Sequence, residues 1–205
     1  MKTLFALIAG FATFFLTPNK GETTYVVDVQ NSKLAWTAKK VTGSHTGLVP
    51  VSSGSLSWAN NKLKGGSFEI DVKNLTVTDL TDASYNAKLV GHLKGEDFFA
   101  VDKFPKANLV ITSATPKGSD SYDLVGKLTI KGISNEVRFP ATIKTEKGKL
   151  SAQATIAVDR TKYDIKYRSK NFFENLGDKA IDNDFELNVT LVAIVSDSPK
   201  SKIGK

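Results

Sequence analysis

The chain has 205 residues, of which 40% are hydrophobic and 24% are charged, a composition typical of one globular domain with a sizeable core. It contains no cysteine, which excludes disulfides, thiolate metal sites and lipid anchors attached through cysteine. The 28 basic and 21 acidic residues are spread along the chain and form no basic stripe with stacking aromatics, so no nucleic-acid partner is predicted. The mild basic excess leaves transient contact with a membrane surface open.

The two ends differ from the rest of the chain. Lys2 followed by the uncharged, apolar run Leu4–Leu16 is typical of a secretory signal peptide, which we predict over residues 1–17. This run is too short to cross a bilayer, which takes about 20 apolar residues, and a buried N-terminal helix is the alternative interpretation. Residues 197–205 contain three lysines among Ser, Pro and Gly, which predicts a disordered basic tail.

Between the ends, apolar and polar residues alternate with the period of two that is typical of half-buried β-strands. The clearest segments are Phe68–Lys73, Ser121–Lys131, Val137–Lys144, Leu150–Asp159 and Phe185–Val195, with shorter ones at Tyr25–Val29, Leu34–Val41 and Ser55–Trp58. Turn residues at 60–61, 118–120, 132–135 and 147–148 predict hairpin connections. Long amphipathic strands must close or stack, since an open sheet leaves an apolar face in water. We therefore predict an all-β domain over residues 24–196, an antiparallel barrel of about eight strands, with a two-sheet sandwich as the alternative.

Two long segments interrupt this pattern. The first interruption is Leu75–Pro105, which contains most of the segment Tyr85–Ala107. In that segment the spacing of Leu89 and Leu93 by four residues predicts a short helix, which would act as a lid on the barrel. The second interruption, Asp159–Asp184, is rich in charges and aromatic residues. Long ordered loops are often functional, so we expect these two segments to form the rim of a pocket if they meet at one end of the barrel.

Catalytic and metal-binding motifs are scarce. The chain has only two histidines and lacks the G-x-S-x-G, H-E-x-x-H and phosphate-loop patterns. His92 and Glu96 lie four residues apart, a spacing that suits a metal or acid–base pair on one helix face, but also a histidine that merely packs or caps a helix. His45 falls in a segment that we expect to be a loop. No metal site and no catalytic residue are predicted with these patterns.

Several short motifs carry a family resemblance. They are the block His92–Phe99 followed by Lys103–Ala107, the segment Leu128–Ser134 with Val137, the Asp159–Tyr163 motif, and Trp36 with Thr46–Gly47. In their order along the chain, from Tyr25 to Ile194, they resemble the signature segments of the YceI-like family.

This resemblance implies an extended, lipocalin-like barrel of eight antiparallel strands that is exported to the periplasm. It also implies binding of a long amphiphile such as a polyisoprenoid, a quinone or a fatty-acid derivative, without enzymatic activity. The chain departs from the family pattern at Gly95, at Ala100 and at Tyr163–Asp164, all in the two interrupting segments. The resemblance therefore leaves the identity of the ligand open.

The resulting hypothesis is an exported carrier or sequestering protein with an apolar tunnel, and it assigns residues to two parts of the site. The wall candidates are Leu89, Leu93, Phe98, Phe99 and Phe172, and the rim candidates for a headgroup are Lys88, His92, Lys94, Arg160 and Arg168. The bound lipid would be the only ligand, with no other cofactor, and a homodimer is left open. Two alternatives remain: a barrel enzyme that uses His92 with Glu96 or Asp97 on an apolar substrate, and a solid-core barrel that acts through protein contacts.

Overall fold

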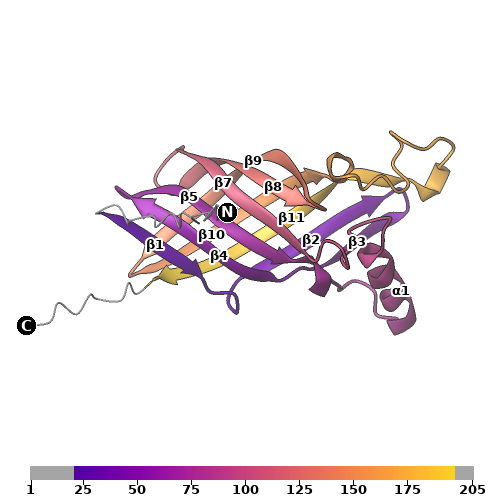
Figure 1. The fold of residues 1–205 in the computed structure, drawn as a ribbon, viewed down its shortest axis with the longest axis horizontal. Coiled ribbons are helices and arrows are strands. Elements are labelled where there is room, and N and C mark those ends of the chain that lie inside the picture. The colour runs from indigo at the N-terminus through magenta and orange to yellow at the C-terminus, as the bar shows by residue number, and fades with distance from the viewer. Residues whose placement is uncertain (1–20, 197–205) are drawn as a thin grey trace, which may run out of the picture.

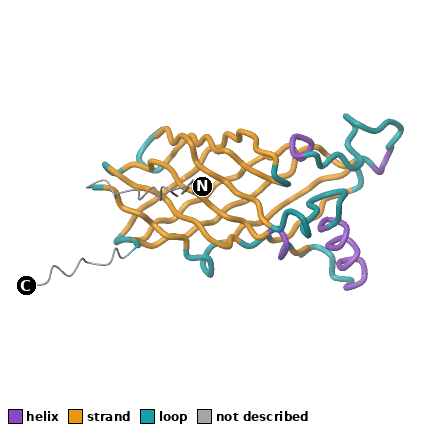
Figure 2. The backbone as a smooth tube through the Cα atoms, viewed as in Figure 1, coloured by secondary structure: helices purple, strands orange, loops and turns teal. Residues whose placement is uncertain are grey.

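The computed structural model describes residues 21–196, so the predicted signal peptide and basic tail lie outside the described residues. The described chain is mostly strand, with one α-helix, α1 (Ala83–Lys94), and three short 3-10 helices, η1 (Val72–Asn74), η2 (Arg160–Tyr163) and η3 (Gly177–Lys179) (Figures 1 and 2). The strands are β1 (Glu22–Val27), β2 (Lys33–Lys40), β3 (Gly43–Leu48), β4 (Val51–Ala59), β5 (Lys62–Asp71), β6 (Thr76–Val77), β7 (Lys106–Pro116), β8 (Ser121–Ile130), β9 (Ile133–Glu146), β10 (Lys149–Asp159) and β11 (Ile181–Val195).

Eight antiparallel strands close into a barrel in the order β1-β4-β5-β7-β8-β9-β10-β11. The ring closes because β11 pairs with β10 along its length and with β1 near its C-terminal end, where Tyr25 lies opposite Val195. The N-terminal part of β11 pairs instead with β2, so β2, β3 and β6 extend the wall at one end of the barrel (Figure 1). The predicted all-β barrel is confirmed, and the sandwich alternative was wrong.

Tight turns of two residues join several neighbouring strands. Asn60–Asn61, Lys131–Gly132 and Lys147–Gly148 all have positive φ at both positions, as the primed hairpin turns require. The turn predicted at 132–135 was misplaced, because Lys131 takes the first left-handed position and residues 133–135 already belong to β9.

Strand β3 was not predicted, and His45, expected in a loop, lies within it. Close packing around Gly47 explains why β3 has a glycine here and how it fits between β2 and β6. Gly47 lies opposite Trp36 on β2 and Val77 on β6. A Cβ atom at Gly47 would overlap the carbonyl oxygen of Thr76 and lie 2.6 Å from the Trp36 ring. The Trp36 indole donates a hydrogen bond to that same carbonyl oxygen at 3.1 Å, so the missing side chain lets three strands approach each other.

The apolar faces of the strands point into the barrel and form one continuous core. At the end away from α1, Trp58 packs edge-on against Tyr25 and Tyr122, each at a ring-centroid distance of 6.4 Å. This aromatic cluster fills the interior where β4 ends and β8 begins, so that end of the barrel is closed by side chains.

Candidate functional site

The two interrupting segments meet at one end of the barrel, which we call the mouth (Figure 1). One is the lid segment, Tyr85–Ala107, which contains most of α1, and the other is the loop of residues 160–180 between β10 and β11. Asp82 caps the start of α1 by accepting hydrogen bonds from the Ser84 and Tyr85 amides, and Gly95 caps its end. The predicted short helix is therefore confirmed. None of its residues is fully buried, so α1 lies on the barrel rather than in its core.

Beneath the mouth, the barrel interior contains two apolar chambers. The first has a volume of about 100 Å³ and the second, deeper in the barrel, about 80 Å³. Both are lined by the same four aliphatic side chains, Leu34, Ile70, Leu128 and Leu187, so the two chambers adjoin at a waist formed by these side chains. Side chains therefore do not fill the interior completely.

The structure brings several of the predicted wall residues together at the first chamber. Leu93, Phe98 and Phe99 of the lid segment all line it. Leu89 is half-buried on α1 and does not line either chamber, and Phe172 is 50% exposed on the outer loop. These last two positions correct the predicted wall, because Leu89 lies one helical turn before Leu93 and Phe172 lies near the tip of its loop.

The predicted rim residues divide into outer and inner positions. Lys88 lies over the Tyr85 ring at 5.6 Å on α1, and Arg168 lies over the Tyr167 ring at 5.0 Å. Lys94, at the end of α1, is half-buried and lines neither chamber. Only Arg160 lines the first chamber, and it does so from a buried position rather than from the rim.

Arg160 connects the start of the mouth loop to its end. Its side chain is 5% exposed and donates hydrogen bonds to the carbonyl oxygens of Ile165 at 2.7 Å, Asp182 at 2.9 Å and Ile181 at 3.1 Å. Burial lowers the pKa of Arg160, and the nearby carboxylates of Asp159 and Asp182 act in the opposite direction. A guanidinium has five N–H donors, so some donors remain for an oxygen atom inside the chamber.

An aromatic clasp of His92, Phe98 and Tyr167 joins the lid segment to the mouth loop. The His92 ring meets Phe98 at 4.9 Å and Tyr167 at 4.8 Å, both edge-on, and Phe98 lies 5.5 Å from Tyr167. Tyr167 was not predicted, although Tyr163, Ile165 and Tyr167 alternate as a buried edge would. Because Phe98 also lines the first chamber, the clasp forms its outer cover.

Of the two carboxylates considered as partners of His92, the structure places Asp97 beside it and not Glu96. The helix ends at Lys94, so the spacing of four residues no longer places the two side chains on one face. The His92 Nε2 atom lies 3.0 Å from Asp97, and Glu96 pairs instead with Lys103 at 3.0 Å.

A second histidine–carboxylate pair holds the start of the lid segment. His45 on β3 lies 2.8 Å from Asp79, which also accepts a hydrogen bond from the Thr46 amide at 2.8 Å. Burial raises the pKa of Asp79, but the hydrogen bonds from Thr46 and His45 outweigh it, so the pKa lies below its ordinary value. The pair therefore fixes the path by which the chain leaves the barrel toward α1.

Tyr163 carries a buried hydroxyl with no hydrogen-bond partner among the described residues. Burial raises the pKa of Tyr163 to about 12, and the charge of Asp159 adds to the effect.

Two further searches covered residues 21–196 only. In this part of the chain, no three His, Asp or Glu side chains gather closely enough to hold a metal ion. No helix there is long and apolar enough to cross a membrane.

The sequence model of the YceI-like domain matches residues 25–193, which is nearly the whole barrel. The chain belongs to the YceI-like family. Its curated relatives include a UPF0312 protein of Pseudomonas putida strain F1, 31% identical over 45% of this chain and 46% of the relative. A UPF0312 protein of Shewanella oneidensis is 27% identical over 68% of this chain and 72% of the relative. The chain thus matches about half the length of the P. putida relative.

Several solved structures share the fold. Burkholderia cenocepacia BcnA superposes with a TM-score of 0.65 at 23% identity, over 82% of this chain and 99% of BcnA. A polyisoprenoid binding domain from Saccharophagus degradans gives 0.60 at 12% identity, over 84% and 98%. The Campylobacter jejuni YCEI protein gives 0.55 at 16% identity, over 97% and 100%. At these identities the likeness concerns the fold alone.

Proposed function

We propose that this YceI-like protein binds a long-chain amphiphile, with the chain in the two chambers and the polar group at the mouth. The observation that carries the proposal is the pair of adjoining apolar chambers inside a closed barrel, covered at one end by the lid segment. Asp182, at the start of β11, lines the first chamber and is exposed. We infer that the chain enters at this end of the barrel, where residues of the lid segment and of the mouth loop also line the chamber.

The volumes suit a chain of moderate length. One water-sized sphere occupies roughly 10–15 Å³, so chambers of about 100 and 80 Å³ hold roughly 12 to 18 such spheres together. A chain carbon is of similar size, which points to an acyl or isoprenoid chain of about that many carbon atoms. Each buried CH₂ group contributes about 0.8 kcal/mol before the costs of association and ordering are subtracted.

The polar lining gives the ligand an orientation. The second chamber is lined almost entirely by apolar side chains, whereas Arg160 and Asp182 line the first. The free N–H donors of Arg160 favour a carbonyl, hydroxyl, carboxylate or phosphate oxygen near the mouth, because a charged donor in an apolar cavity gains most from such a partner. The tail then points toward Trp58 and its aromatic neighbours.

The role that follows is carriage or sequestration, with no chemical step on the ligand. The fold shared with a solved polyisoprenoid binding domain supports an isoprenoid as one class of ligand. The predicted signal peptide supports export to the periplasm, where a chain too apolar for water needs such a carrier.

Organic extraction of the protein purified without detergent, followed by mass spectrometry, tests the proposal. We expect a single class of amphiphile with a chain in the stated range, at close to one molecule per protein. Absence of any such lipid, together with no uptake of added quinone or palmitate, would overturn the proposal.

A further inference from the structure

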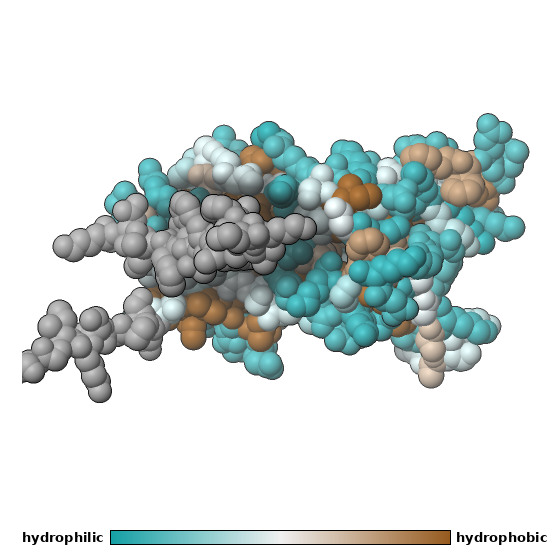
Figure 3. Space-filling model, viewed as in Figure 1, coloured by the Kyte–Doolittle hydropathy of each residue, from teal (hydrophilic) through white to brown (hydrophobic). Residues whose placement is uncertain are grey.

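Two adjacent phenylalanines project into solvent from the mouth loop. Phe172 is 50% exposed and Phe173 is 48% exposed, although the barrel core lies close to the base of the same loop. Figure 3 shows an apolar patch at the extremity of the molecule where this loop lies, apart from the patches on the barrel body. We call Phe172 and Phe173 the aromatic tip.

The loop is built to hold this tip outward. The backbone amides of Phe172 and Phe173 both donate to the carbonyl oxygen of Ser169 at 3.0 Å. Ser169 itself is fully buried, and its hydroxyl donates to Asn183 at 2.7 Å while accepting from the Asn171 amide at 3.2 Å. Exposure of the two rings therefore follows from an ordered turn on a buried anchor.

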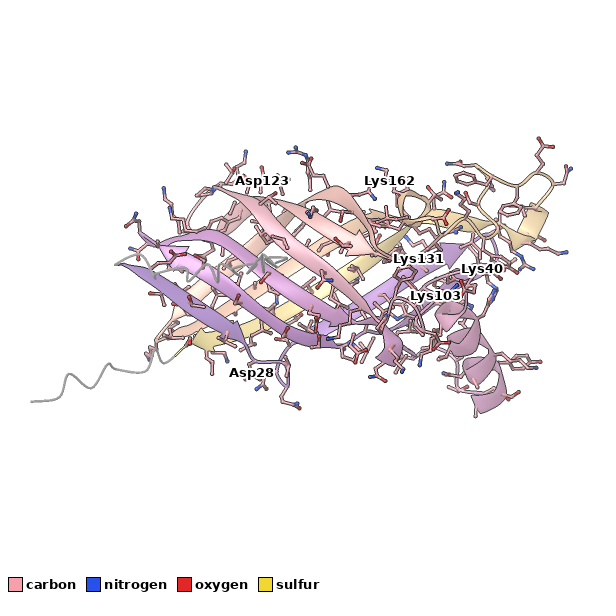
Figure 4. The ribbon with its side chains drawn as sticks, in the orientation of Figure 1. Asp28, Lys40, Lys103, Asp123, Lys131 and Lys162 are labelled. Atoms are coloured by element: carbon pink, nitrogen blue, oxygen red, sulfur yellow. The ribbon has the colours of Figure 1, made fainter. Side chains whose placement is uncertain are left out.

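Basic residues outnumber acidic ones in the loop that carries the aromatic tip. Between residues 165 and 180 there are four basic side chains, Lys166, Arg168, Lys170 and Lys179, against two acidic ones, Glu174 and Asp178. Lys166 lies 5.2 Å from the centre of the Phe172 ring. Figure 4 shows Lys40, on the neighbouring end of β2, at the same end of the molecule.

We propose that the aromatic tip docks the mouth onto an anionic lipid bilayer. Aromatic rings flanked by Lys and Arg suit the boundary between headgroups and acyl chains, where the rings are buried and the cations meet lipid phosphates. The inference rests on the proposed function, since a long chain passes from bilayer to tunnel without crossing water only when the mouth faces the membrane. Scattered aliphatic residues exposed on strands need no such explanation.

Vesicle flotation of the full-length protein, which measures how much protein binds to the vesicles, tests the docking surface. The probe is a vesicle of phosphatidylethanolamine and phosphatidylglycerol, and the variant is Phe172→Ser combined with Phe173→Ser. The matched control is Val26→Ser combined with Ile194→Ser, because these two side chains are 44% and 53% exposed and lie opposite each other on β1 and β11. We expect the variant to lose about tenfold or more of its vesicle partitioning and the control to change by less than about twofold.

Two further measurements separate docking from ligand binding. Replacing phosphatidylglycerol by phosphatidylcholine is expected to weaken partitioning several-fold, because the basic residues around the tip lose their anionic partners. Uptake of palmitate added from solution is expected to be the same in the variant and the wild type. No flotation of the wild type, or equal flotation of wild type and variant, would overturn the docking proposal, whereas failure of palmitate uptake in all proteins would overturn the proposed function instead.

Discussion

Narrowing the second chamber is expected to shorten the chain that the protein can hold. Ala154 on β10 lines this chamber and pairs with Val189 and Ala141, which line it too. With a volume of about 80 Å³, the chamber holds roughly five to eight water-sized spheres, and the phenyl ring of an Ala154→Phe variant takes up most of that space. The variant should still accept a chain that ends in the first chamber.

The size of the effect follows from the number of chain carbons displaced. At about 0.8 kcal/mol per buried CH₂, five to eight carbons correspond to roughly 4–6 kcal/mol of gross burial, of which the ordering costs remove about half. We therefore expect palmitate to bind roughly a hundredfold more weakly to Ala154→Phe, while octanoate binds within about threefold of the wild type.

Calorimetric titration of delipidated protein with both acids provides the assay. Ala157→Phe is the matched control, since Ala157 lies on the same strand but on its exposed outer face. If Ala154→Phe weakened the binding of palmitate and octanoate equally, or if Ala157→Phe weakened palmitate binding as much as Ala154→Phe does, the assignment of the second chamber to the chain's tail would be refuted.

Three further substitutions test the structure around the mouth. Arg160→Met leaves three carbonyl oxygens without their donor and should lower the free energy of unfolding, measured by urea titration, by about 3–5 kcal/mol. The control Arg168→Met removes only the contact with the Tyr167 ring and should cost less than about 1 kcal/mol. Equal losses in the two variants would contradict the role of Arg160 as a connector. Tyr163→Phe removes a buried hydroxyl without a partner and should stabilise the protein by up to about 1–3 kcal/mol. Because the folded-state pKa of Tyr163 is raised to about 12 from 10.0, wild-type stability should fall as the pH rises from about 10 to 12, by about 2–3 kcal/mol from this group; a variant with the same pH dependence would contradict that assignment. Gly47→Ala should prevent correct assembly of β2, β3 and β6, whereas Gly91→Ala, on α1 with open space around it, should stabilise the protein by about 0.5–1 kcal/mol. Circular dichroism and thermal unfolding measure both effects. A Gly47→Ala protein that is folded and as stable as the wild type would contradict the packing described.

The parts of the fold that the sequence predicted are those where burial of one strand face sets the pattern. In β8 and β10 the apolar side chains must point inward, so their alternation is visible without any tertiary information. Strand β3 has no such pattern, because its residues suit particular contacts. His45 pairs with Asp79, and Gly47 makes room for the Trp36 ring, and both partners lie outside β3 in the sequence.

The candidate site was predicted less completely because its geometry depends on contacts between distant segments. Arg160 is charged, as a rim residue would be, but it is held in a buried position by hydrogen bonds to three carbonyl oxygens. Two of these carbonyl groups lie more than 20 residues away in the sequence, so the residues around Arg160 do not reveal them. The pairing of His92 with Asp97 follows from the end of α1 before Gly95, a glycine that could have been interpreted as a helix terminus. Exposure of Phe172 depends on the turn anchored at the buried Ser169, and the orientation of this turn cannot be predicted from the residues around it.

The position of a bound chain tests the central claim most directly. The two tryptophans lie toward opposite ends of the barrel, since Trp36 lines the first chamber and Trp58 belongs to the aromatic cluster at the closed end. Their two indole N–H signals can be followed by NMR while delipidated protein binds stearate that carries a nitroxide either near its carboxylate or near its tail. The account predicts that the carboxylate-side label broadens the Trp36 signal and the tail-side label broadens the Trp58 signal. Broadening of neither signal at saturation, or the reverse order, would contradict a chain held in the tunnel with its headgroup at the mouth.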